Sequence, residues 1–543
     1  MRNTWSLLGL LLLLAGCGSN KDAADSPRVF RLNLSAPLTS LDPAFASDQP
    51  NSWACLQLYN GLVQLDRNLQ VVPSIAGSWE IGDDQKTYTF HLRQDVFFHD
   101  SECFPNNTGR KVRAADFVYS FSRLSDPATA ARGFWVFDQL LDEDAPFLAP
   151  NDSTLVIRLR APFAPFLQRL CMPYCSVVAE EAIVAYGKDV RSHPVGTGPF
   201  TFVKWLEGNM LILHRNPNYF ERDDQGNQLP YLDGVNIRFI ANKSTEFLKF
   251  MNGELDFVSD IDVSLKNQIL SADGQLRPEY ADRFSLLKGP YLNTEYLSIL
   301  MDSDAAVLRG NPLQFKEVRQ AINMAFSRQE MLLFLRSNRG IAATGGVVPP
   351  SLLGTESSVS YGYDYNPEKA ARLLEEAGFA GGVGLPEMVL HTTAEYQDFA
   401  TYLKDKLEDI GIALRIETVD PRVLREMRIK EETPFFRSSW IADYSDAESY
   451  LQMFFGGNGA PPNYTRYNNH AFDSLYMAAV TETIPAERIR LYRQMDSLMM
   501  QEAPIVPLYY DEVYRFVGKD VEGLEPDALN HLRLKKVRFR DPA

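Results

Sequence analysis

The segment from Arg437 to Asp443 carries the residue types that best suit ligand binding in this chain of 543 residues. Read as a β-strand, it places Ser439, Ile441 and Asp443 on one face, and Arg437 continues that face. A carboxylate and a guanidinium are fixed partners for opposite charges, and an extended backbone can hydrogen-bond an extended guest. The pattern indicates binding without covalent chemistry.

Residues that could support catalysis form none of the familiar catalytic patterns. The seven histidines include no His-Glu-x-x-His helix, and there is no Gly-x-Ser-x-Gly elbow. Adjacent acids such as Glu431 and Glu432 are typical of a solvated surface. Because carboxylate pairs for glycoside hydrolysis are spaced in three dimensions, a hydrolase stays open as the alternative of another class. We therefore expect a binding protein rather than an enzyme, and we expect no cofactor.

The cysteines of the body give no metal site. Cys171 and Cys175 lie close in sequence, but no histidine or second cysteine pair follows with zinc spacing, so we expect core or disulfide cysteines and no bound metal. With Cys55 and Cys103 they allow three full disulfide pairings, among which the sequence does not choose.

The amino terminus has the pattern of an export signal. The apolar run from Leu7 to Leu14 is too short to span a bilayer. It ends in the motif LAGC at residues 14–17, which resembles the lipobox of bacterial lipoproteins. We expect a signal peptide over residues 1–16 and an acylated Cys17 that starts a small, polar tether over residues 17–27. An ordinary signal peptide cut near the same place is the alternative.

Composition and size favour a large globular protein. Apolar residues make up 45% and charged residues 23%, so a core can form, and the length calls for two or more lobes. A formal net charge of −16 would repel phosphate backbones, which argues against a nucleic-acid partner.

The elements that would position the Arg437–Asp443 segment are mixed α and β. Period-two alternation predicts strands over residues 30–34, 87–92 and 155–160. A helical stripe from Ala370 to Ala377 has Asn366 as its cap, Pro367 in its first turn and Gly378 as its stop.

Two further patterns extend this α/β organisation. A strand at 388–392, a helix at 399–410 and a strand at 412–419 form a β-α-β unit and imply a parallel pair. A helix through residues 491–499 then precedes an apolar strand at 504–510.

The order of motifs from Leu41 to Tyr510 resembles the family 5 extracellular solute-binding proteins, the dipeptide and oligopeptide receptors of ABC importers. The motifs are SLDP (40–43), YNGLV (59–63), PSIAGSWE (73–80), TYTFHLR (87–93), ADFVYS (115–120), PVGTGPF (194–200), RQAIN (319–323) and WIADY (440–444). Each motif alone is weak, and their common order carries the resemblance.

The resemblance implies a type II periplasmic-binding-protein fold, with two α/β lobes on a hinge and an extra domain inserted in lobe I. By analogy lobe I gathers residues 28–56, 187–287 and 505–543, the inserted domain covers 57–186, and lobe II covers 288–504. The residues at 288–290, Lys-Gly-Pro, are a plausible first hinge crossing.

The resemblance also implies roles for individual residues. Asp443 matches the residue that pairs with the amino terminus of a peptide, and the backbone of residues 439–441 matches the part that hydrogen-bonds it. Trp440 would line a side-chain pocket, and Arg437 would meet the carboxylate of a short peptide. The other side of the ligand would be formed by Ser47, Asp48, Gln49, Phe134 and Trp135.

The function implied is that of a monomeric, lipid-anchored receptor, in the periplasm or at the cell surface, which delivers short peptides to a permease. Related receptors take nickel chelates, haem or oligosaccharides on the same fold, so the ligand class stays open. An acidic residue at position 443 favours a cationic group such as a peptide ammonium.

Overall fold

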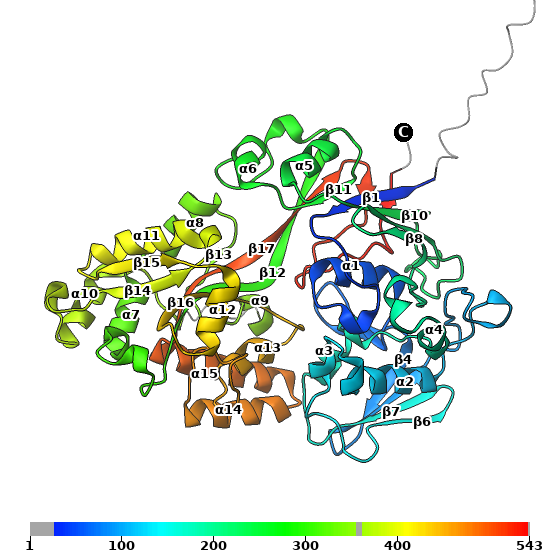
Figure 1. Cartoon of the computed structure of the whole chain (residues 1–543), viewed down its shortest axis with the longest axis horizontal. Coiled ribbons are helices and arrows are strands. Elements are labelled where there is room, and N and C mark those ends of the chain that lie inside the picture. Colours follow the sequence, from blue (N-terminus) through cyan, green and yellow to red (C-terminus); the bar gives the residue numbers. More distant parts are fainter. Residues whose placement is uncertain (1–26, 355–360, 541–543) are drawn as a thin grey trace, which may run out of the picture.

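The computed structural model describes residues 27–354 and 361–540, in which two lobes lie side by side. Two long strands, β12 (Phe284–Ile299) and β17 (Ile505–Gly518), cross from one lobe to the other (Figure 1). They pair antiparallel, and their register shifts between Pro290 and Thr294 and again between Glu295 and Tyr296. The two crossing strands form the hinge of the fold, and the crossing expected at 288–290 lies beside the first register shift.

One sheet of 11 strands runs through both lobes, in the order β15-β14-β16-β12-β17-β11-β1-β10-β9-β8, with β13 paired to β17. The first half of β17 pairs with β13 (Ile341–Ala342) in lobe II, and its last residues pair with β11 (Phe257–Ser259) in lobe I. β17 therefore runs from the β13 side of the sheet to the β11 side. The domain boundaries, including the one expected at residue 505, stay predictions.

Lobe I is built on the β11 side of the sheet. Alternation in β1 buries Phe30, Leu32 and Leu34, as the sequence predicts. Its remaining elements are β1 (Val29–Leu34), α1 (Gln49–Leu58), β8 (Phe200–Leu206), β9 (Met210–Arg215), β10 (Gly234–Phe239), α5 (Lys243–Met251), α6 (Val263–Ile269), β18 (Val521–Glu522) and β19 (Arg538–Phe539).

A separate four-stranded sheet, β4-β5-β7-β6, falls within the range 57–186 proposed for the inserted domain. Near the two ends of this range the backbone is tied together, since the N–H of Gly198 donates to the Leu58 carbonyl at 2.9 Å. A Cβ at Gly198 would come within 2.4 Å of the Leu58 carbonyl carbon, so only glycine fits this approach. The elements are β2 (Val63–Leu65), β3 (Val71–Pro73), β4 (Ala76–Ile81), β5 (Thr87–Leu92), α2 (Ala114–Ser125), β6 (Phe147–Asn151), β7 (Thr154–Arg158), α3 (Phe166–Leu170) and α4 (Glu180–Tyr186).

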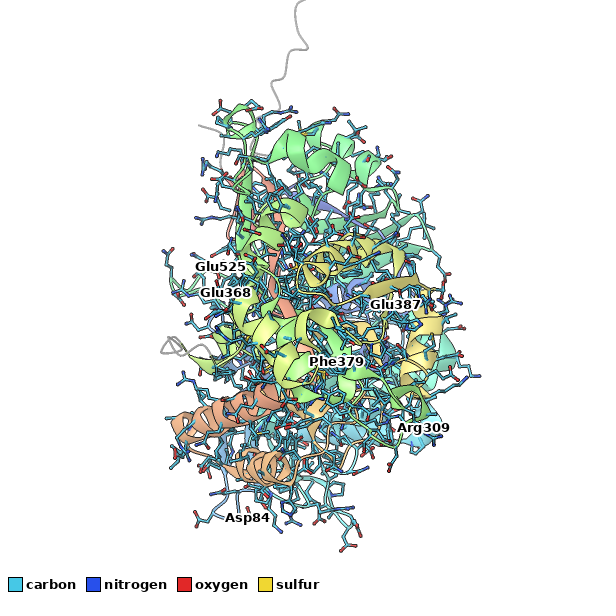
Figure 2. All side chains as sticks on the ribbon, turned by 90° about the vertical axis from the view of Figure 1, so that its left-hand side faces the viewer. Asp84, Arg309, Glu368, Phe379, Glu387 and Glu525 are labelled. Carbon is cyan, nitrogen blue, oxygen red and sulfur yellow. The ribbon has the colours of Figure 1, made fainter. Side chains whose placement is uncertain are left out.

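Lobe II contains the predicted β-α-β unit. β14 (Met388–Thr392) and β15 (Leu414–Thr418) pair in parallel, joined by α11 (Gln397–Glu408). The side chain of Asn366 caps α10 (Pro367–Glu376) by accepting from the Lys369 N–H at 2.9 Å, as predicted. Figure 2 shows the outer face of this lobe, with Glu368, Phe379 and Glu387 labelled. Its other elements are α7 (Lys316–Met324), α8 (Arg328–Arg336), α9 (Pro350–Leu353), α12 (Pro421–Ile429), β16 (Phe435–Ile441), α13 (Glu448–Leu451), α14 (His470–Thr481) and α15 (Pro485–Glu502).

The largest group of packed core residues continues from the inserted domain into lobe II, and a second group fills lobe I. The two lobes thus touch through buried side chains as well as through the hinge strands. Among the described residues, no helix combines the length and the apolar character needed to cross a bilayer.

Candidate ligand-binding site

Strand β16 has one paired edge and one largely open edge. On one side all residues from Phe435 to Ile441 pair with β12. On the other side β14 pairs only at Phe436, opposite His391. Within the described ranges no strand pairs with the second edge from Arg437 to Ile441. An open edge of this kind can accept an extended peptide as an added strand.

The side chains along this edge are accessible. Ser439 and Trp440 are half-buried, and Ile441 keeps 50% of its surface exposed. The indole N–H of Trp440 is buried and meets no acceptor among the described residues. Since a buried donor without an acceptor is costly, a ligand acceptor at this point would contribute to binding.

Asp443 lies two residues past the end of β16. Its backbone N–H donates to the Ser449 hydroxyl at 3.0 Å, which fixes the turn. In the described part of the chain its carboxylate accepts no hydrogen bond and forms no ion pair, and the residue remains accessible to solvent. Desolvation by the surrounding protein raises the pKa of Asp443 to about 6. The positive charge of Arg169 opposes this rise, and the negative charge of Glu448 adds to it. Asp443 is thus an unpaired carboxylate at the end of the open edge.

The pKa of Tyr174, in the inserted domain, is affected by charged residues from both lobes. Burial, then the charge of Asp443, then the charge of Asp48 raise the pKa of Tyr174 to about 12. Asp48 belongs to lobe I, Tyr174 to the inserted domain and Asp443 to lobe II. The ring of Trp135 lies 6.4 Å from the Tyr174 ring in an edge-on arrangement. The structure thus gathers three predicted residues, Asp48, Trp135 and Asp443, around a tyrosine that the sequence did not single out.

The other predicted residues of this side flank the same group. Asp48 caps α1, since its carboxylate accepts from the Asn51 N–H at 3.0 Å. Ser47 and Gln49 on either side of it are exposed, and Phe134 beside Trp135 is half-buried. Within the described residues no hydrogen bond, ion pair or ring contact joins Ser47, Gln49 or Phe134 to Asp443, so their part in the site stays a prediction.

Arg437 has a partner inside the protein. Its guanidinium donates to the Glu295 carboxylate at 2.7 Å and lies 3.7 Å from the centre of the Tyr396 ring. Burial raises the pKa of Glu295, and the charge of Arg437 opposes that rise. Arg437 also lines a hollow with apolar residues such as Leu297, Phe326 and Phe399. A ligand carboxylate at Arg437 would therefore have to share this cation with Glu295.

The comparison with known protein families agrees with this geometry. The model described as bacterial extracellular solute-binding proteins, family 5 Middle, matches residues 70–462. The chain belongs to this family. Family 5 proteins are the substrate-binding components of ABC transporters, and this protein is therefore a transport binding protein.

Relatives of this family 5 protein cover almost its whole length. The glutathione-binding protein GsiB of Salmonella typhi is 27% identical over 493 residues, which is 89% of each chain. The periplasmic binding protein DppA of Helicobacter pylori, in complex with the peptide STSA, is 25% identical with a TM-score of 0.74, over 94% of this chain and 98% of that one. HbpA2 of Haemophilus parasuis shares the fold at 24% identity and a TM-score of 0.81, over 94% and 99% of the two chains. The two-lobed family fold expected from the sequence is confirmed.

Several residues of the site carry no signal in the sequence. Arg169, Tyr174 and Glu295 are single polar or aromatic residues outside the motifs, and only the fold brings them to Asp443 and Arg437. The four cysteines Cys55, Cys103, Cys171 and Cys175 are all free. Within the described residues no group of three or more potential ligands could hold a metal. Cys17 and the signal peptide lie outside the described residues.

Proposed function

We propose that this family 5 protein captures short peptides in an extended conformation and delivers them to the permease of an ABC importer. The open edge of β16 would hydrogen-bond the peptide backbone, which all peptides share. Asp443 would receive the ammonium group, and Trp440 would line the pocket of a side chain. The unpaired carboxylate of Asp443 at the end of that edge carries the proposal, because it favours a ligand that begins with a positive charge.

Two relatives support a peptide-like ligand. The structure of DppA of H. pylori is a complex with the peptide STSA, and GsiB of S. typhi is a glutathione-binding protein. Both kinds of ligand carry an ammonium group, amide bonds and a carboxylate. We favour ordinary short peptides, since a long open edge suits a continuous extended backbone.

Calorimetric titration of the mature protein tests this proposal. The panel contains Ser-Thr-Ser-Ala, Met-Leu and glutathione, with native mass spectrometry of whatever co-purifies. Micromolar peptide affinity, about −8 kcal/mol, is the expected result. A co-purifying nickel chelate, haem or oligosaccharide without peptide affinity would contradict the peptide assignment. Peptides should be recovered intact, and cleaved products would favour the hydrolase alternative.

We further propose that the protein is exported and held at a bacterial membrane by lipid on Cys17, as a monomer. The support is the LAGC motif directly after the apolar run. Cys17→Ser should move the protein from the membrane fraction to the soluble fraction, with mass spectrometry of the mature amino terminus as the direct measurement. An unmodified amino terminus in the native protein would contradict lipid attachment.

A further inference from the structure

An ion pair and a backbone hydrogen bond tie the inserted domain to lobe I. Arg123 of the inserted domain makes a buried ion pair with Asp42 of lobe I, at 2.5 Å, with 14% and 2% of the two side chains exposed. The backbone bond between Gly198 and Leu58 adds a second tie at the point of insertion. A contact between the inserted domain and lobe II therefore also links lobe I to lobe II.

Arg169 makes such a contact. It lies on α3 of the inserted domain and is 8% exposed. Its guanidinium donates to the Tyr444 hydroxyl at 3.2 Å and comes within 4.0 Å of the Glu448 carboxylate, both in lobe II. A buried charge needs a fixed partner, so this contact depends on the inserted domain and lobe II being together.

Aromatic rings surround the Arg169 guanidinium. Its central carbon lies 4.6 Å from the centre of the Phe163 ring, 5.1 Å from that of Tyr444 and 5.6 Å from that of Trp135. Two of these rings come from the inserted domain and one from lobe II. Such cation–π contacts strengthen when water is excluded, as it is here.

Glu448 has no other cation within ion-pair distance in the described structure. It is 1% exposed and accepts hydrogen bonds from the hydroxyls of Tyr444 and Tyr476. The nearby Asp446 forms its own ion pair with Arg488, at 3.3 Å. The charge of Glu448 is therefore balanced across the lobe boundary by Arg169.

The contact stands directly beside the ammonium site. Tyr444 follows Asp443 in sequence and is 1% exposed, whereas Asp443 itself is accessible. Arg169 is also close enough to the Asp443 carboxylate for its charge to lower the pKa of Asp443. A ligand with its ammonium at Asp443 would therefore come close to the packed group of Tyr444, Glu448 and Arg169.

We infer that Arg169 fastens the inserted domain to lobe II beside Asp443 and blocks any part of a ligand that extends past its ammonium group. The blocking role rests on the proposed function. The fastening role rests on the contacts alone. Arg169 is a positioning and specificity residue here, since the ammonium itself is received by Asp443.

The test needs a ligand that is longer at the ammonium end and keeps its charge. N-propyl derivatives of Ser-Thr-Ser-Ala and Met-Leu meet this requirement, because a secondary amine stays protonated. Calorimetry on the wild type should show N-propyl peptides binding at least about tenfold more weakly than the free amines. Arg169→Ala should reduce this difference to about threefold or less. Arg169→Lys keeps the positive charge but loses the planar guanidinium that contacts the rings, so it should keep only part of the difference.

A ligand-free measurement separates the two roles. Small-angle X-ray scattering should show a larger radius of gyration for unliganded Arg169→Ala than for the wild type. Arg372→Ala, on an exposed arginine of lobe II, is the matched control and should change nothing. Glu448→Gln removes the charge and keeps the side-chain shape, with one acceptor oxygen for a tyrosine hydroxyl and an NH2 group in place of the other oxygen. It therefore tests the same contact if Arg169→Ala folds poorly.

The outcomes are distinct. Unchanged scattering in Arg169→Ala and Glu448→Gln, with folding verified by circular dichroism, would overturn the fastening role. Equal affinity of the wild type for free and N-propyl peptides, or undiminished discrimination in Arg169→Ala, would overturn the blocking role. If no peptide binds the wild type, the proposed function and the blocking role both fall, and scattering alone decides the fastening role.

Discussion

Glu295 on β12 and Arg437 on β16 form an ion pair of 2.7 Å between neighbouring strands, with Glu295 4% exposed. Arg437 also lies over the Tyr396 ring, and the Tyr396 hydroxyl donates to Glu295 at 3.2 Å. The arginine that was predicted to meet a ligand carboxylate is therefore already neutralised inside the protein. Its contribution to binding depends on how Glu295 and the ligand share it.

Glu295→Gln is expected to tighten the binding of short peptides with a free carboxylate, by roughly fivefold, because Arg437 loses its internal partner. The melting temperature should fall, since a half-buried cation is left without its counter-charge. Calorimetry with the same peptide as a carboxylate and as a carboxamide measures the effect. If both forms gain equally, Arg437 does not meet the ligand carboxylate.

Asp443→Asn and Asp443→Ala are each expected to weaken peptide binding by well over about tenfold, because the ammonium loses its charged partner. Thermal stability at pH 7 should not fall, since the described structure gives the Asp443 carboxylate no internal hydrogen bond or ion pair and its raised pKa means that the ionised form does not stabilise the fold. Asp304→Asn, on an exposed acid of the same lobe, is the control for calorimetry and melting. Unaltered affinity in both Asp443 variants would contradict the site assignment.

Peptide affinity should depend on pH through Asp443, whose pKa in the free protein is raised to about 6. Protonation removes the charge that attracts the ammonium, and a bound ammonium lowers the pKa, so affinity rises with pH through this range. Between pH 5 and pH 7 the gain should be about tenfold, and above about pH 8 affinity should fall as the peptide amino group loses its proton. Asp443→Asn should flatten the acid side of the profile, and an unchanged acid side in that variant would assign the titration to another group.

Arg328→Ala should lower the free energy of unfolding by about 3 kcal/mol or more, because buried carbonyl groups lose their hydrogen-bond donor. Arg328 is 3% exposed and donates to the Pro507 carbonyl at 2.6 Å and to those of Asn323 and Tyr363 at 3.0 Å each. Denaturant titration gives the measurement, with Arg372→Ala as the exposed control. Equal midpoints for the two variants would show that these bonds contribute little.

The parts of the fold that follow local rules could be predicted from the sequence. Asn366, Pro367 and Gly378 delimit α10 because capping and helix termination depend on neighbouring residues only. The parallel pair β14 and β15 follows from the strand-helix-strand order. The predicted helix of this unit differs from α11 by two residues at each end, as is usual for fraying ends.

The polar pairs of the site could not be predicted in this way. Glu295 and Arg437 are 142 positions apart, and Arg169 and Tyr444 are 275 apart. Nothing local distinguishes these residues from surface charges, because their pairing appears only when distant strands and the inserted domain meet. The course of β17 from β13 to β11 could not be predicted for a related reason, since a long apolar strand looks the same on either side of a lobe boundary.

The hinge of β12 and β17 is a hydrogen-bonded ribbon rather than a pair of loose linkers. Such a ribbon resists stretching and sideways sliding, and yields mainly by torsion where its register shifts. The two halves of the binding site would then stay face to face while the lobes open and close, so a ligand would meet halves that are already aligned. Opening and closing would then follow mainly one rotational coordinate instead of many.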